Sequence, residues 1–184
     1  MNLANNLTVL RILLVPIFVG TLLYYSPEKI FLKDVGVIIF VFACLTDALD
    51  GYLARRMNQT TALGSYIDPI ADKLLLLSGF LSLSLMTHLP PPMKIPAWVT
   101  IPVISRDVII LIGSTLIFVT TGHLKARPLW IGKLTTVSQM CALLLSLIMA
   151  PKLLQLSFFA LTVALTVVSG ILYIRLGGKL LQTT

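Results

Sequence analysis

Long apolar runs recur along the whole chain. They lie at about residues 9–25, 35–56, 63–88, 97–120, 131–150 and 153–174. Each run is close to the roughly 20 residues that a helix needs to cross the hydrocarbon core of a bilayer. The short connections leave no room for a separate soluble domain. The pattern therefore predicts an all-α fold, a polytopic membrane bundle of six transmembrane helices that forms a single domain over residues 1–184.

The composition agrees with a chain that is solvated by lipid. Hydrophobic residues make up 57% of the sequence and charged residues only 11%, which is far from the usual balance of a soluble domain. The formal net charge is +7, but the basic residues border the apolar runs and leave no soluble basic face for a duplex. We therefore expect membrane lipids, anionic ones in particular, as partners, and no nucleic acid.

The basic residues also indicate an orientation. If both termini face the cytoplasm, that side receives eight of the cations near the ends of the runs and the other side receives four. The cytoplasmic set is Arg11, Arg55, Arg56, Lys125, Arg127, Lys133, Arg175 and Lys179, and the opposite set is Lys29, Lys33, Lys94 and Lys152. Because basic residues near span ends resist translocation, we expect a protein of the cell (inner) membrane with cytoplasmic termini.

Most of the acidic residues lie in or beside apolar runs. Seven acids occur, and only Glu28 and Asp34 lie in an obvious loop; the other five are Asp47, Asp50, Asp68, Asp72 and Asp107. A carboxylate inside a membrane is costly unless it is paired, bound to a metal or facing water. Each of the five is therefore a candidate functional residue.

Four of these acids form two pairs on either side of one short connection. Asp47 and Asp50 are three residues apart, and Asp68 and Asp72 are four apart, so each pair lies on one face of a helix. At about 1.5 Å per residue, an antiparallel hairpin brings all four to similar depths of roughly 9–15 Å. Such a quartet repels itself unless cations neutralise it, and oxygen ligands without adjacent Cys or His favour Mg²⁺ or Mn²⁺ over zinc. We expect two such ions to clamp a diphosphate.

Small and basic residues accompany the aspartates. Gly51 follows Asp50, and Gly64 precedes Asp68 by one turn, so a ligand can approach the backbone closely at both places. Arg55 offers a planar fork that suits phosphate oxygens. The alternative for Arg55 is ordinary anchoring at the cytoplasmic surface.

The segment DALDGYLAR, followed by eight residues and then GSYIDPIAD, resembles the signature of the CDP-alcohol phosphotransferases. All eight residues of the signature, which spans 26 positions, are present: Asp47, Asp50, Gly51, Ala54, Arg55, Gly64, Asp68 and Asp72. The spacing of Asn5, Thr8 and Arg11 before the first run is also similar to this family. The resemblance implies a homodimer.

The resemblance also implies a reaction and a role for each signature residue. Asp47, Asp50 and Asp68 would ligate two divalent ions with Asp72 beside them, and Asp50, Gly51, Ala54, Arg55 and Gly64 would shape the CDP site. Asp72 would act as the general base that takes a proton from an acceptor hydroxyl. The phosphatidyl group of CDP-diacylglycerol would pass to that oxygen, and CMP would leave.

The acceptor is predicted from the second half of the chain. Arg106 and Asp107 lie inside the fourth run. They form either a mutually neutralising pair or a site in which Arg106 binds an anionic acceptor, and we favour the second interpretation. Arg127 and Lys133 flank the next loop, either as further acceptor-binding cations or as anchors at the membrane surface. The segments ISRDVII and LKARPLWIGKLTTVSQ resemble both phosphatidylglycerophosphate synthases and cardiolipin synthases of the CDP-alcohol type. Many of the former carry further cations where this chain has Ser114 and Thr135. This difference favours phosphatidylglycerol over glycerol 3-phosphate as the acceptor.

One alternative belongs to another functional class. Buried aspartates also serve ion-coupled membrane transporters, which relay protons or bind Na⁺. A transporter would release no CMP. The positions of Arg55 and the glycines suit a diphosphate better than a bare ion, so the enzyme is the favoured hypothesis.

Overall fold

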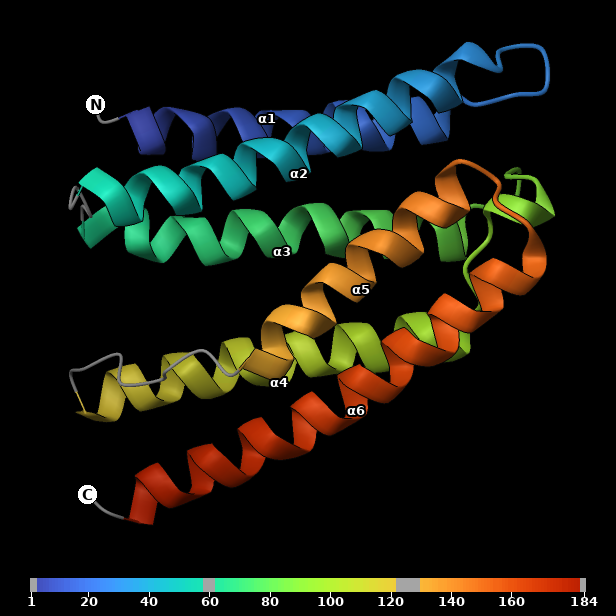
Figure 1. The fold of residues 1–184 in the computed structure, drawn as a ribbon. Helices are drawn as coiled ribbons and strands as arrows, with labels where there is room; N and C mark the ends of the chain where they lie inside the picture. The colour runs from blue at the N-terminus through green and yellow to red at the C-terminus, as the bar shows by residue number, and fades with distance from the viewer. Residues whose placement is uncertain (1–2, 58–61, 122–129, 183–184) are drawn as a thin grey trace. The chain divides into compact units, whose positions relative to one another are not determined.

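The structure is a computed structural model that describes residues 3–57, 62–121 and 130–182. Within these ranges, side chains are described except at residues 3–8, 48–57, 62–72, 114, 116–121, 177 and 179–182. All regular elements of the described ranges are helical, which confirms the all-α prediction (Figure 1). They are α1 (Leu3–Leu23), α2 (Phe31–Met57), α3 (Ala62–Leu85), the short 3₁₀ helix η1 (Pro91–Met93), α4 (Ala97–Thr121), α5 (Trp130–Leu147) and α6 (Lys152–Gln182).

Each α-helix overlaps most of one of the predicted apolar runs. The largest differences are at helix ends where polar residues interrupt the apolar pattern, such as the start of α1 at Leu3, before the run at 9. α2 begins at Phe31, before the run at 35, and its first turn contains Asp34, whose charge suits the positive end of the helix dipole. α6 continues to Gln182, beyond the end of the last run.

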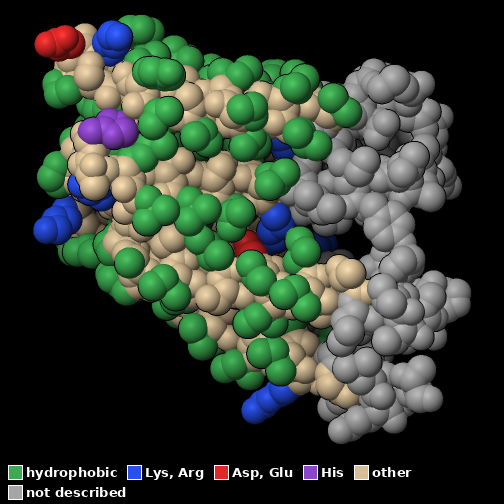
Figure 2. Space-filling view, turned by 180° about the vertical axis from the view of Figure 1, so that it is seen from behind, with side chains coloured by type: hydrophobic (Ala, Val, Ile, Leu, Met, Phe, Trp, Pro, Cys, Tyr) green, Lys and Arg blue, Asp and Glu red, His purple; other side chains and the backbone are tan. Residues whose placement is uncertain are grey.

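Several helices have the length and apolarity of membrane spans. Among the described residues, three segments are long and apolar enough to cross a bilayer: Pro91–Gly113, Trp130–Leu147 and Lys152–Leu176. Shorter apolar helices cover Val9–Leu23 and Lys73–Leu85. Large hydrophobic side chains are widely exposed, as Figure 2 shows for one face, and lipid is the solvent that accommodates them. The chain is therefore a membrane protein, and six complete spans stay a prediction.

The chain divides into two compact units. The first contains Met1–Ile95 and Leu143–Ala150, and the second contains Pro96–Ala142 and Pro151–Thr184. Each unit is described by itself below. The expectation of a single domain stays a prediction.

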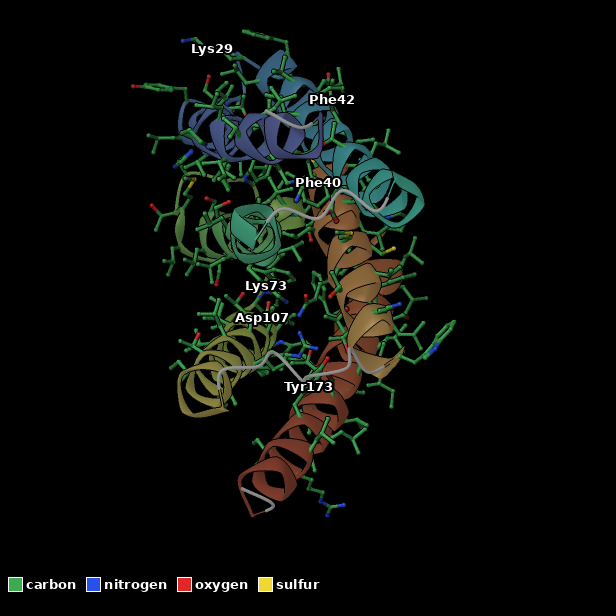
Figure 3. The ribbon with its side chains drawn as sticks, turned by 90° about the vertical axis from the view of Figure 1, so that its left-hand side faces the viewer. Lys29, Phe40, Phe42, Lys73, Asp107 and Tyr173 are labelled. Carbon is green, nitrogen blue, oxygen red and sulfur yellow. The ribbon has the colours of Figure 1, made fainter. Side chains whose placement is uncertain are left out.

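The core of the first unit forms where α1 packs against α2 and α3. The rings of Phe18 and Phe40 lie 5.8 Å apart between centroids, and both side chains are buried. Figure 3 labels both Phe40 and Phe42; Phe42 lies two residues further along α2 and is exposed. Thus α2 has an inner face toward α1 and an outer face suited to lipid.

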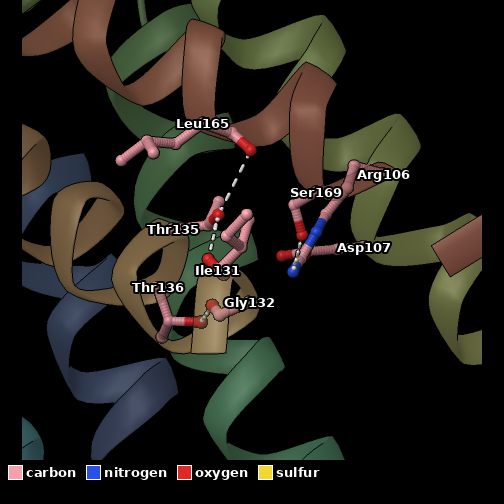
Figure 4. Close-up of polar contacts among 8 residues, drawn as sticks. All are labelled: Arg106, Asp107, Ile131, Gly132, Thr135, Thr136, Leu165 and Ser169. Atoms are coloured by element: carbon pink, nitrogen blue, oxygen red, sulfur yellow. Dashed lines mark hydrogen bonds and ion pairs between the residues drawn. The ribbon is translucent and has the colours of Figure 1, made fainter. Parts of the chain in front are cut away.

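The second unit combines α4, α6 and most of α5. α4 packs against α6. Two hydrogen bonds join α5 to α6: the hydroxyls of Ser138 and Thr162 are 2.7 Å apart, and the Thr135 hydroxyl donates to the Leu165 carbonyl at 3.3 Å (Figure 4). Small hydroxyl side chains of this kind let membrane helices approach closely and bond to each other.

Candidate functional site

The predicted aspartates lie on two consecutive helices. Asp47 and Asp50 belong to α2, and Asp68 and Asp72 belong to α3. The helical spacing that places each pair on one face is therefore present. Of these four, only the side chain of Asp47 lies within the described part of the chain. The convergence of the quartet, and the roles of Gly51, Ala54, Arg55 and Gly64, concern side chains outside it and stay predictions.

Asp47 has a partner that could not be identified from the sequence. Nη1 of Arg11, on α1, lies 3.1 Å from Oδ1 of Asp47, on α2. From the sequence, Arg11 was interpreted as a cation at the membrane boundary and as part of an N-terminal spacing similar to the family, without a partner, yet its side chain is 1% exposed. The available signal was its position inside the first apolar run, because a charge there needs a counterion.

Arg106 on α4 is held by a second charged cluster. Its Nη1 donates to Oδ1 of Asp107 at 2.7 Å, and its Nη2 donates to Oγ of Ser169 at 2.8 Å (Figure 4). Its Cζ also lies 5.6 Å from the ring centroid of Tyr173, within the range of a cation–π contact. The structure thus contains the ion pair that the sequence analysis weighed as the alternative for these two residues.

The hydrogen bonds to Asp107 and Ser169 use Nη1 and Nη2 of Arg106 and do not involve its Nε. Its Nε is buried and has no hydrogen-bond partner among the described residues. An unsatisfied buried donor of a charged group is costly. Arg106 therefore combines a fixed position with the capacity to donate to one further acceptor.

Gly132 on α5 makes room for this cluster. A Cβ added there would lie 2.9 Å from the hydroxyl oxygen of Tyr173 and 3.3 Å from Nη2 of Arg106. The absence of a side chain thus allows α5 to approach Arg106 and Tyr173 closely. Sequence reasoning missed Gly132, Ser169 and Tyr173, because their role depends on which helices meet.

We expect Gly132→Ala to destabilise the protein by about 1–3 kcal/mol, because the new methyl group overpacks the contact with Tyr173. Gly113→Ala is the matched control, since nothing lies within 4 Å of a Cβ at that position on α4. Thermal unfolding of both variants in detergent measures the difference. Equal melting temperatures for the two variants would show that Gly132 is not tightly packed.

The other candidate acceptor residues are less constrained. Lys133 is exposed, and its Nζ lies 5.8 Å from the ring centroid of Trp130, one turn earlier on α5. This arrangement is typical of an aromatic and a basic residue at a membrane surface. Arg127 lies outside the described residues. An acceptor-binding role for either residue stays a prediction.

The expected metal site can be judged only by its donor chemistry. No group of three or more His, Cys, Asp or Glu residues that could hold a metal occurs among the described side chains, which exclude those of Asp50, Asp68 and Asp72. The four aspartates would supply oxygen ligands alone. This donor set fits Mg²⁺ or Mn²⁺ and does not resemble a zinc site.

Together, the fold and the charged positions define an all-helical membrane protein with acids and arginines inside its helices, and such charges indicate a functional site. A sequence model of the CDP-alcohol phosphatidyltransferases matches residues 1–168. The chain belongs to this family, and the resemblance seen in the signature is confirmed. It is therefore a membrane enzyme of phospholipid biosynthesis that transfers a phosphatidyl group from a CDP-activated lipid to an alcohol.

Several relatives carry more particular names. A probable phosphatidylglycerophosphate synthase of Mycobacterium tuberculosis is 35% identical over 177 residues, which covers 94% of this chain and 80% of that protein. Two proteins named CDP-diacylglycerol–glycerol-3-phosphate 3-phosphatidyltransferase are also similar. The one from Blochmanniella floridana is 33% identical over 78% of this chain and 72% of its own length. The one from Yersinia enterocolitica is 35% identical over 78% of this chain and 75% of its own length.

Proposed function

We propose that the protein transfers the phosphatidyl group of CDP-diacylglycerol to glycerol 3-phosphate and releases CMP. The observation that carries this proposal is its similarity, over most of its length, to relatives named for that reaction. These names do not support the preference for phosphatidylglycerol, and thus for cardiolipin as product, that the sequence analysis drew from Ser114 and Thr135.

The structure gives a physical reason to set one of these two residues aside. Thr135 is completely buried, and its hydroxyl donates to the Ile131 carbonyl at 2.7 Å and to the Leu165 carbonyl on α6. Its identity therefore reflects the packing of α5 against α6. The absence of a lysine at position 135 therefore does not argue against glycerol 3-phosphate. The side chain of Ser114 lies outside the described part of the chain.

We assign the acceptor phosphate to Arg106, with Lys133 and Arg127 as further cations. Arg106 is buried, is held in place by Asp107 and Ser169, and has an Nε donor without a partner among the described residues. A phosphate ester with two negative charges is bound well by a fixed guanidinium, because charge-assisted hydrogen bonds are about twice as strong as neutral ones. An uncharged alcohol would gain much less from this arrangement.

We assign the donor to the aspartate helices. Asp47, Asp50, Asp68 and Asp72 would hold two Mg²⁺ or Mn²⁺ ions, which when bound would neutralise charge on the diphosphate of CDP-diacylglycerol. Gly51, Ala54 and Gly64 would let the nucleotide approach the backbone, and Arg55 would contact phosphate oxygens. The support is the complete signature on α2 and α3.

In the proposed reaction, Asp72 accepts the proton of an acceptor hydroxyl, and the oxygen attacks the phosphorus that bears the diacylglycerol. The new bond joins that phosphorus to the acceptor oxygen. The bond between the same phosphorus and the oxygen of CMP breaks, so CMP leaves as the second product.

The proposal also includes six spans, an active site that faces the cytoplasm, and a homodimer. The basic residues support the spans and the orientation, and the family resemblance supports the homodimer.

An acceptor assay tests the proposed function. Purified protein is incubated with CDP-diacylglycerol, Mg²⁺ or Mn²⁺, and either glycerol 3-phosphate or phosphatidylglycerol, and both CMP release and the lipid product are measured. We expect phosphatidylglycerophosphate from glycerol 3-phosphate. Cardiolipin formation from phosphatidylglycerol, without product from glycerol 3-phosphate, would restore the preference drawn from the sequence.

We expect Arg106→Lys to raise the KM for glycerol 3-phosphate about tenfold to a hundredfold, because a charged hydrogen bond contributes about 1.5–3 kcal/mol. Lysine keeps the positive charge beside Asp107 and removes the fork. The KM for CDP-diacylglycerol should not change. Arg175→Gln is the control, since Arg175 is an exposed cation on α6. Equal changes in both KM values would exclude a specific acceptor role.

A further inference from the structure

Arg11 is a fully buried charge in the first helix. Its neighbours Val9, Leu10 and Leu13 are exposed by 43%, 37% and 58%, whereas Arg11 is 1% exposed. The guanidinium therefore does not extend toward a membrane surface as an anchoring arginine does. Burial of such a charge is unfavourable unless an opposite charge compensates it. Its location needs a specific explanation.

The counterion of Arg11 is the first aspartate of the signature. The ion pair joins α1 to α2 across 36 positions of the sequence, from Arg11 to Asp47, at 3.1 Å. The two side chains differ in exposure, since Asp47 remains 30% exposed while Arg11 is inaccessible. The arginine thus reaches Asp47 from inside the first unit, and part of the aspartate side chain remains open on another side.

We propose that Arg11 is a positioning residue that fixes the Asp47 carboxylate for metal binding, so that α1 contributes to the active centre. This inference rests on the proposed function, in which Asp47 is a metal ligand. A guanidinium has no lone pair to give to a metal, so Arg11 acts only through Asp47. It fixes the carboxylate orientation and offsets part of the repulsion among the four acids before the ions bind.

A purely structural role is the competing explanation. In that case, the ion pair would hold α1 against α2 and its loss would lower stability alone. The two explanations differ in a single observable, the affinity for metal in the absence of substrate. Partners of ligating carboxylates typically change metal affinity about 10–100-fold when they are replaced.

The test measures Mn²⁺ binding by electron paramagnetic resonance on purified, metal-depleted protein without lipid substrate. We expect Arg11→Met to weaken Mn²⁺ binding about 10–100-fold, and Arg11→Lys to recover part of the loss because it keeps the charge. Leu22→Ala is the control, since Leu22 is a fully buried residue of α1 and its replacement leaves a cavity far along the helix. It should lower the melting temperature and leave Mn²⁺ affinity unchanged.

Each outcome has one consequence. The positioning role would be overturned if Arg11→Met bound Mn²⁺ with the affinity of the wild type. If Arg11→Met does not fold, the same result for Arg11→Lys would overturn it. So would equal losses of affinity in the arginine variants and Leu22→Ala. If the wild-type protein itself bound no Mn²⁺, the proposed metal site would fail as well, so the two failures are distinguishable.

Discussion

Asp72→Asn is expected to lower the rate of CMP release about 10²–10⁴-fold, which is the usual contribution of a positioned general base. Asparagine has nearly the same shape as aspartate and keeps one carbonyl oxygen, but it cannot accept the proton of the acceptor hydroxyl at neutral pH. The affinity for CDP-diacylglycerol should therefore change little while turnover collapses. Single-turnover assays and lipid binding, measured on the same preparation, separate the two effects.

The control for this variant is Asp34→Asn. Asp34 lies in the first turn of α2, and its Oδ1 is 3.3 Å from Nζ of Lys33, a contact with no place in the proposed chemistry. Its replacement should leave turnover unchanged. A rate near that of the wild type for Asp72→Asn would remove Asp72 from the base role. A parallel loss of Mn²⁺ binding would instead indicate that Asp72 acts mainly as a metal ligand.

The helices could be predicted from the sequence because one physical constraint determines them. A backbone in lipid must satisfy its hydrogen bonds internally. An apolar run of about 20 residues therefore forms a helix independently of the neighbouring helices. The six long helices accordingly cover the six runs. The polar ends, such as the first turn of α2 with Lys33 and Asp34, lie outside this constraint and shifted the boundaries.

The partners of the charged residues could not be predicted in the same way. The apolar surroundings of Arg11 and Arg106 show that each needs compensation, but not which residue provides it. Asp107 adjoins Arg106 in sequence and was found as a candidate partner, whereas Ser169 and Tyr173 come from another helix. The contact between Arg11 and Asp47 likewise depends on the packing of α1 against α2. Sequence therefore identifies the need for a counterion, and tertiary structure supplies its identity.

The acceptor could not be predicted from the sequence for a related reason. The prediction relied on cations that are absent at Ser114 and Thr135, as though both positions faced a substrate. Position 135 instead lies buried in the contact between α5 and α6. Gly132, which lies close to Arg106, shows no chemical signal in the sequence, because a glycine matters only through what approaches it. We therefore expect helix packing as well as charge to influence the choice of acceptor.

Chelation of divalent metal is expected to abolish CMP release, and added Mg²⁺ or Mn²⁺ should restore it. The reason is electrostatic: if the four aspartates converge as proposed, they would repel one another and a diphosphate as well, and bound cations would reverse both interactions. Because metal coordination contributes several kcal/mol to such a transition state, the loss should reach at least about 10³-fold. The measurement is CMP release after dialysis against EDTA, followed by titration with each metal.

Zinc provides the discriminating comparison, because Zn²⁺ prefers tetrahedral sites with nitrogen or sulfur ligands and the predicted donor set contains only carboxylates. We therefore expect Zn²⁺ to restore little activity at concentrations where Mg²⁺ is fully effective. Asp68→Asn should shift the Mg²⁺ dependence to higher concentrations, since it removes one anionic ligand without changing the shape of the side chain. Turnover that persists in EDTA, with an Asp68→Asn variant that behaves like the wild type, would mean that the aspartates serve the reaction by some means other than holding metal.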